Sequence, residues 1–97
     1  MNNRRLLSPP QFMPTIRILE QPTSDILLIS WREPGRCCYS EQRWVRRKAS
    51  ERGVCALSGA MVRAGDTVYA PTGKPEPQNH DQVILNRSLR ATATSVA

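Results

Sequence analysis

The feature that most constrains the fold is a stretch with two glycine turns, GVCALSGAMVRAGDTVYAP, residues 53–71. Ser58-Gly59 and Gly65-Asp66 are turn pairs, because glycine adopts positive φ without steric cost and an aspartate carboxylate accepts hydrogen bonds from nearby backbone. Residues 67–71 after the second turn alternate as a short strand does. The stretch therefore predicts a tight knuckle followed by a hairpin.

The first of these turns is similar to a zinc knuckle of the C-x-x-C-G type, in which two thiolates three residues apart bind one tetrahedral ion. Here Cys55 is followed by Ser58, whose hydroxyl is not a deprotonated, soft ligand at neutral pH. The candidate ligands of the whole chain are Cys37, Cys38, Cys55 and His80.

A Cys3His site would need His80 to come from the first turn of a helix, as in a treble-clef-like arrangement. The knuckle and the helix each offer one ligand instead of two, and adjacent cysteines rarely reach the same ion. We therefore expect a treble-clef-like knuckle turn without a full metal site and no cofactor, with bound zinc as the alternative. In the preferred interpretation Cys55 is a small buried apolar residue.

The remaining segments predict further strands and one helix. Residues 15–21 alternate, residues 26–31 form a short apolar run, and residues 38–49 contain strand-forming aromatic residues. Asn79 is expected to cap a helix that carries Leu85 and Leu89 on one face. The sequence thus predicts an α+β fold: a small, mostly antiparallel sheet of four to five short strands with one C-terminal helix. The expected core residues are Ile16, Ile18, Leu28, Trp31, Trp44, Leu57, Val68, Tyr69, Leu85 and Leu89.

The chain has 97 residues, which is enough for one small domain. We expect a flexible N-terminal tail at 1–14, a single β-rich domain at 15–90 and a flexible C-terminal tail at 91–97. Such a domain buries only a small core, and an unpaired strand at a sheet edge attracts another strand. Association with an unknown protein partner or with a second copy is therefore expected.

Positive charge is concentrated in the predicted strand at residues 36–52, within a chain of net charge +6. Tyr39 and Trp44 lie among these cations, and guanidinium groups with aromatic rings can form a platform for single-stranded nucleic acid. The alternative is a solvated strand edge whose charges discourage aggregation. The cations are Arg36, Arg43, Arg46, Arg47, Lys48 and Arg52.

Nothing in the sequence resembles catalytic machinery. There is one histidine, the glycines are scattered singly, and no carboxylate pair has a recognisable setting. No apolar stretch has the length of a signal peptide or of a membrane span. We expect a cytoplasmic protein that is not an enzyme, binds no small-molecule substrate and does not associate with a membrane.

Three segments in this order carry a family resemblance: SWREPGRCCYSEQRW, GVCALSGAMVRAGDTVYAP and NHDQVILNRSL. Together they resemble a small proteobacterial family known as a domain of unknown function (domain of unknown function 3331), over about residues 16–89. The resemblance implies no activity, cofactor or catalytic residue. The expected function is a non-enzymatic module for protein interaction or accessory regulation. Nucleic-acid binding by residues 36–52 is the alternative, and a degenerate zinc-binding domain is the lesser one.

Overall fold

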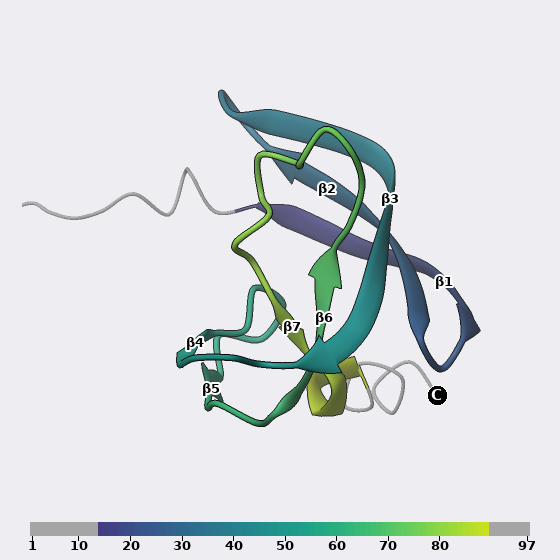
Figure 1. The fold of residues 1–97 in the computed structure, drawn as a ribbon. Helices are drawn as coiled ribbons and strands as arrows, with labels where there is room; N and C mark the ends of the chain where they lie inside the picture. Colours follow the sequence, from purple (N-terminus) through teal and green to yellow (C-terminus); the bar gives the residue numbers. More distant parts are fainter. Residues whose placement is uncertain (1–13, 90–97) are drawn as a thin grey trace, which may run out of the picture.

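The computed structural model describes residues 14–89. The turn expected at Gly65-Asp66 separates β5 from β6, and another turn at residues 34–36 separates β2 from β3. A five-stranded antiparallel sheet has the order β1-β2-β3-β6-β7, and β4 and β5 pair as a separate ribbon. The sheet curls into a half-barrel, and a short helix at residues 86–89 follows β7 (Figure 1). This arrangement confirms the predicted fold class. The strands are β1 (Thr15–Thr23), β2 (Ile26–Glu33), β3 (Cys37–Lys48), β4 (Gly53–Val54), β5 (Met61–Val62), β6 (Thr67–Pro71) and β7 (Ile84–Leu85).

The core lies on the inner face of the curled sheet. Leu27, Ile29 and Trp31 of β2 are fully buried and alternate with half-buried residues. The expectation that Leu28 belongs to this core is wrong. Side chains alternate across a strand, so a residue between Leu27 and Ile29 must point to the outer face.

The two tryptophans form the centre of this core. Trp31 and Trp44 stack with their ring centroids 5.7 Å apart, and Trp44 has no exposed surface. Offset aromatic pairs of this kind add stability beyond the area that they bury, by about 0.5–1.5 kcal/mol. The rest of the expected core is present, with Val68, Tyr69 and Leu85 fully buried and Ile16, Ile18, Leu57 and Leu89 packed against the cluster.

An extra residue in β3 changes which side chains face the core. Tyr39 pairs with Trp31 and Gln42 with Ile29, so β3 has one more residue than β2 between these pairs. Such a bulge reverses the alternation along a strand. On an ideal strand Tyr39 and Arg43 would share a face, whereas in the structure Tyr39 packs against the core and Arg43 is exposed.

Strand β6 is covered on both faces. Its consecutive residues Val68, Tyr69 and Ala70 are all buried. Tyr69 also fixes the hairpin between β1 and β2, because its hydroxyl donates to the carbonyl of Ser24 at 2.6 Å and accepts from Gln21 at 2.7 Å. Cys55 of the knuckle and Val62 of β5 belong to the same core cluster.

The helix begins later than the sequence predicted. Residues 78–81 form turns, Val83 forms an isolated bridge with Cys55, and β7 follows before the helix at 86–89. Asn79 is therefore not a helix cap; it is fully buried and hydrogen-bonded to Gln42. The apolar residues Ile84 and Leu85 suit a strand buried against β6 as well as a helix face, so the pattern alone could not distinguish the two.

The tails expected at 1–14 and 91–97 lie outside the described residues, except for Pro14. Within residues 14–89, no helix is both long and apolar enough to cross a bilayer.

Candidate functional site

Two backbone hydrogen bonds close the knuckle. The Cys55 amide donates to the Ala60 carbonyl at 2.8 Å, and the Gly59 amide donates to the Cys55 carbonyl at 2.8 Å. Gly59 has a φ of 79°, a conformation that residues with a side chain rarely adopt. The loop therefore has the tight shape that a thiolate knuckle requires, with one thiol in it.

Hydrogen-bonding groups surround the sulfur of Cys55. The Leu85 amide lies 3.3 Å from this sulfur and the Ser88 hydroxyl 3.4 Å from it, and the hydroxyls of Ser58 and Ser88 are 2.8 Å apart. Burial raises the pKa of the Cys55 thiol, but its hydrogen bonds with Ser58, Ser88 and the Leu85 amide outweigh burial, so that the pKa lies below its usual value. A network of hydrogen bonds thus joins the knuckle to the helix.

The four candidate metal ligands do not come together. Cys55 is buried beside the helix, whereas His80 is exposed on the loop before β7, where its Nδ1 lies 3.6 Å from a Glu76 oxygen. Ser88, and not His80, is the helix residue next to the knuckle. Across residues 14–89, no three His, Cys, Asp or Glu side chains are grouped so that they could hold a metal ion.

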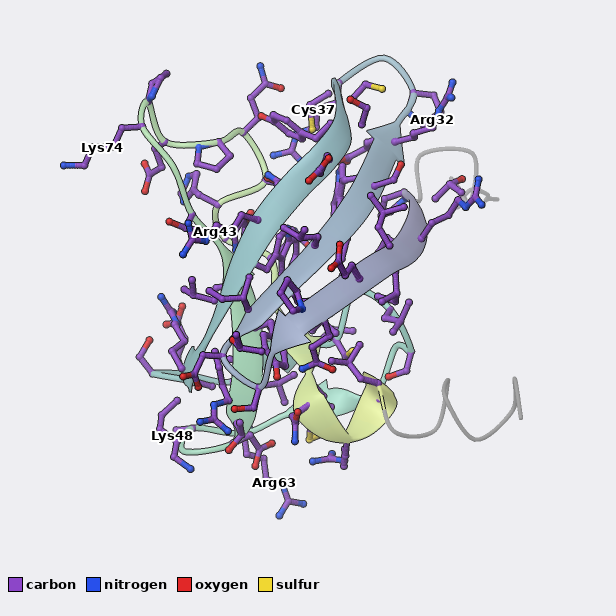
Figure 2. All side chains as sticks on the ribbon, turned by 90° about the vertical axis from the view of Figure 1, so that its right-hand side faces the viewer. Arg32, Cys37, Arg43, Lys48, Arg63 and Lys74 are labelled. Atoms are coloured by element: carbon purple, nitrogen blue, oxygen red, sulfur yellow. The ribbon has the colours of Figure 1, made fainter. Side chains whose placement is uncertain are left out.

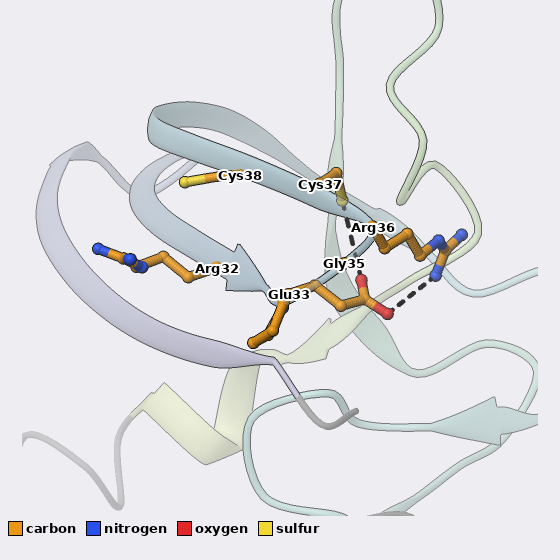
Figure 3. Close-up of a pocket in the computed structure, with 7 residues that line it drawn as sticks. Arg32, Glu33, Gly35, Arg36, Cys37 and Cys38 are labelled. Carbon is orange, nitrogen blue, oxygen red and sulfur yellow. Dashed lines mark hydrogen bonds and ion pairs between the residues drawn. The ribbon is translucent and has the colours of Figure 1, made fainter. Parts of the chain in front are cut away.

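Cys37 and Cys38 line a shallow pocket at the turn between β2 and β3 (Figure 3). Their side chains point to opposite faces: Cys37 lies 3.8 Å from a Glu33 oxygen, and Cys38 lies on the side of Arg32, its strand partner. Burial, and then the Glu33 carboxylate, raises the pKa of the Cys37 thiol, and Arg36 opposes them only in part. Because the thiolate is the reactive form, this setting does not activate Cys37 as a nucleophile.

The Glu33 carboxylate holds this turn together. It accepts hydrogen bonds from the Trp31 indole at 3.1 Å and from the Arg36 guanidinium at 3.1 Å, and it raises the pKa of Arg36. Arg36 also donates to the carbonyl of Gln78 at 2.9 Å. Arg36 therefore anchors the loop before β7 as well as adding charge.

Two more of the six candidate nucleic-acid contacts are held by neighbouring side chains. Arg46 forms an ion pair of 2.6 Å with Asp25, and Lys48 donates to the Thr67 hydroxyl at 3.1 Å. Arg43, Arg47 and Arg52 are exposed and make no ion pair with any residue that the structure describes.

The aromatic residues of the predicted platform do not accompany these cations. Trp44 is in the core, and Tyr39 is half-buried, with its hydroxyl accepting a hydrogen bond from the Gln78 amide at 3.1 Å. Base stacking needs an exposed ring. The arrangement offers cations for a charged partner but no stacking surface along β3.

A buried pair of amide side chains is the main feature that sequence reasoning missed. Gln42 and Asn79 exchange hydrogen bonds of 2.9 and 3.0 Å, and Gln42 also accepts a hydrogen bond from the Trp44 indole at 2.9 Å. These bonds tie the loop before β7 to the sheet. The only sign of this pair in the sequence was Asn79 itself, and an asparagine at that position suits a helix cap as well as a buried hydrogen bond.

Strand β1 forms the outer end of the five-stranded sheet. Within residues 14–89 it pairs on one side alone, with β2. The pairing is regular from Thr15 to Ile18, and register shifts follow on both sides of Glu20. Leu19 lies between Ile18 and Glu20, at the first of these shifts, and is 47 % exposed. At the opposite end of the sheet, β7 has two residues, and the knuckle adjoins it through the bridge from Cys55 to Val83.

Comparison with known proteins gives one match. A family model described as a domain of unknown function (DUF3331) matches residues 8–91, a range that contains the three segments noted in the sequence. No curated protein matches the chain, and neither does any solved structure.

Proposed function

The chain belongs to the family described as a domain of unknown function (DUF3331), and within it we propose that the protein is a non-enzymatic interaction module that binds an extended segment of a partner protein along β1. The membership confirms the resemblance seen in the sequence. It assigns no activity, so the proposal rests on the geometry of the fold.

The single observation that carries the proposal is the open edge of β1. A strand at the end of a sheet presents a row of backbone N–H and C=O groups, and an extended peptide that pairs with them continues the sheet. The first half of β1 is regular, whereas Pro22 and the register shifts interrupt the second half. The partner segment is therefore expected to pair with residues 15–18 and to lie next to Leu19.

A photo-cross-linking residue at Leu19 tests this proposal in the native cell. The control carries the same residue at Met61 of β5, which is 60 % exposed and lies in the separate ribbon. We expect a protein adduct from Leu19 and none from Met61, and slower hydrogen exchange of the amides of residues 15–18 in the isolated complex. A second copy of this chain as the adduct would identify self-association through the same edge.

Two results would reject the edge as the binding site. One is an adduct that forms from Met61 and not from Leu19. The other is a Leu19 adduct in which the amides of β1 exchange as fast as in the free protein, because paired backbone amides must be protected.

Nucleic-acid binding is the second candidate, favoured by the exposed cations Arg43, Arg47 and Arg52 on and after β3. A phosphate backbone can bind to guanidinium groups without stacking, and its affinity then falls steeply with added salt. Titration with a single-stranded oligonucleotide at low salt tests it. An absence of binding there rejects the candidate.

A further inference from the structure

An apolar stripe crosses the outer face of the sheet. Ile26 and Leu28 of β2 and Val45 of β3 are half-buried. Ile26 pairs with Val45 and Leu28 pairs with Arg43, so these side chains share one face, opposite to the core residues Leu27 and Trp44. We name Ile26, Leu28 and Val45, with their neighbours Arg43 and Arg47, the outer stripe.

The outer stripe lies on an open part of the molecule. In Figure 2 the strands β1, β2 and β3 lie in front, and no other segment of residues 14–89 crosses them. The stripe is also distinct from the β1 edge, because its residues belong to the second and third strands of the sheet.

The charges around the stripe are mostly positive, and its arginines make no ion pair within the described residues. Arg43 and Arg47 lie on either side of Val45 along β3. Arg17 and Arg32 also lie on this face, because Arg17 pairs with Ser30 and Arg32 with Cys38. Unpaired arginines beside an apolar surface complement carboxylates, which a guanidinium binds through two parallel hydrogen bonds.

Two glutamates on this face favour an acidic protein segment over a nucleic acid as the partner of the outer stripe. Glu20 pairs with Leu28, and Glu41 precedes the inward-facing Gln42, so both carboxylates lie on the same face as the arginines. A continuous phosphate backbone would meet these carboxylates as well as the arginines, and it has no apolar groups to cover the stripe. A protein segment can place its acidic residues selectively and cover the stripe with apolar side chains.

We propose that the outer stripe binds an acidic protein segment whose apolar residues cover Ile26, Leu28 and Val45 and whose carboxylates pair with Arg43 and Arg47. Apolar contacts supply the affinity at the centre of the interface, and the arginines fix the orientation and speed the encounter.

Selection from a displayed library of short random peptides against the full-length protein tests the proposal. We expect the recovered peptides to combine Asp or Glu with apolar residues and to bind more weakly as salt is added. Arg43→Glu and Arg47→Glu should each weaken the binding of a recovered peptide about tenfold, since each change replaces an attraction by a repulsion. The matched control is Arg63→Glu, an equal charge change at an exposed residue in the turn before β6.

The variants must first show the same thermal unfolding midpoint as the native chain, which is expected because all three arginines are exposed. Recovered peptides without acidic residues would overturn the proposal. So would peptides that bind Arg43→Glu as tightly as they bind Arg63→Glu. A single-stranded oligonucleotide that binds more tightly than the peptides and is released by the same substitutions would show that the face serves nucleic acid instead. Loss of the Leu19 adduct alone would leave this inference standing, because β1 is not part of the outer stripe.

Discussion

Gly59 and Gly65 fix the course of the chain on either side of β5 by their backbone conformation. Their φ angles are 79° and 93°, and an added Cβ at either position would meet no atom within 4 Å. The cost of a side chain there therefore comes from backbone strain and not from crowding. Asp66 completes the second turn, because its carboxylate accepts a hydrogen bond from the Arg63 amide at 2.9 Å.

Gly59→Val and Gly65→Val should each lower the free energy of unfolding by about 1–3 kcal/mol, because a β-branched residue is strained at positive φ. Urea denaturation measures the loss. Gly53→Val is the matched control, since Gly53 lies in β4 without positive φ and also has open space at its Cβ position. Equal stability of all three variants would contradict the strain argument.

At the scale of elements, hydrogen bonds join the knuckle to the helix where a treble-clef-like site would have a metal. The Ser88 hydroxyl lies 3.4 Å from the Cys55 sulfur and 2.8 Å from the Ser58 hydroxyl. A zinc ion with Zn–S bonds of about 2.3 Å holds its sulfur ligands about 3.8 Å apart. The two hydroxyls thus gather beside the Cys55 sulfur, and thiolates in their place would have to spread apart by up to about 1 Å to hold the ion.

The variant Ser58→Cys/Ser88→Cys should bind one Co²⁺ or Zn²⁺ ion with three thiolates, because the three side chains already meet at one point where the knuckle contacts the helix. The absorption spectrum of the cobalt form reports tetrahedral thiolate ligation, and zinc should raise the thermal midpoint of this variant alone. The same variant with Cys55→Ser added serves as the control. A folded double variant that binds no metal would show that the knuckle and the helix are not placed as a ligand set.

The amide pair of Gln42 and Asn79 is the second junction between elements. Gln42→Leu should lower the free energy of unfolding by about 2–6 kcal/mol, since it leaves the Trp44 indole and the Asn79 amide without an acceptor and each buried donor costs about 1–3 kcal/mol. Urea denaturation measures the loss. The control is Gln78→Leu, which changes an exposed residue next to Asn79 in the loop before β7. If both variants lose the same stability, the amide pair does not hold the loop.

At the scale of the whole molecule, one cluster of apolar side chains holds the sheet, the ribbon and the helix together. One side of this cluster is formed by residues of the long strands β1, β2 and β3, and the other side by inner residues of β6 and β7. Apolar burial is the dominant favourable contribution to folding, and here it includes both tryptophans. This cluster is expected to fold the chain without a metal ion.

EDTA should therefore leave the thermal unfolding midpoint of the purified protein unchanged. Tryptophan fluorescence follows the transition, because Trp31 and Trp44 pass from a buried stack into water. A lower midpoint in EDTA, restored by added zinc, would contradict a fold held by apolar contacts.

The sequence alone determined the features that depend on local chemistry. Glycine and aspartate placed the turns around Gly59 and Gly65, alternating apolar residues predicted the strands, and the three ordered segments identified the family. The odd knuckle with Cys55 and Ser58 was also visible, because its shape depends on a few adjacent residues.

The tertiary structure decided which side of each strand meets the core and which distant residues meet each other. The extra residue in β3 turned Tyr39 inward and Arg43 outward, and no local signal marked it. The end of the chain became β7 before the helix because β6 offered Ile84 and Leu85 a strand partner, which outweighed their helical spacing. Ser88 reached Cys55, and His80 did not, because contacts between residues far apart in sequence follow from the packing of the whole chain and not from the preference of any one segment.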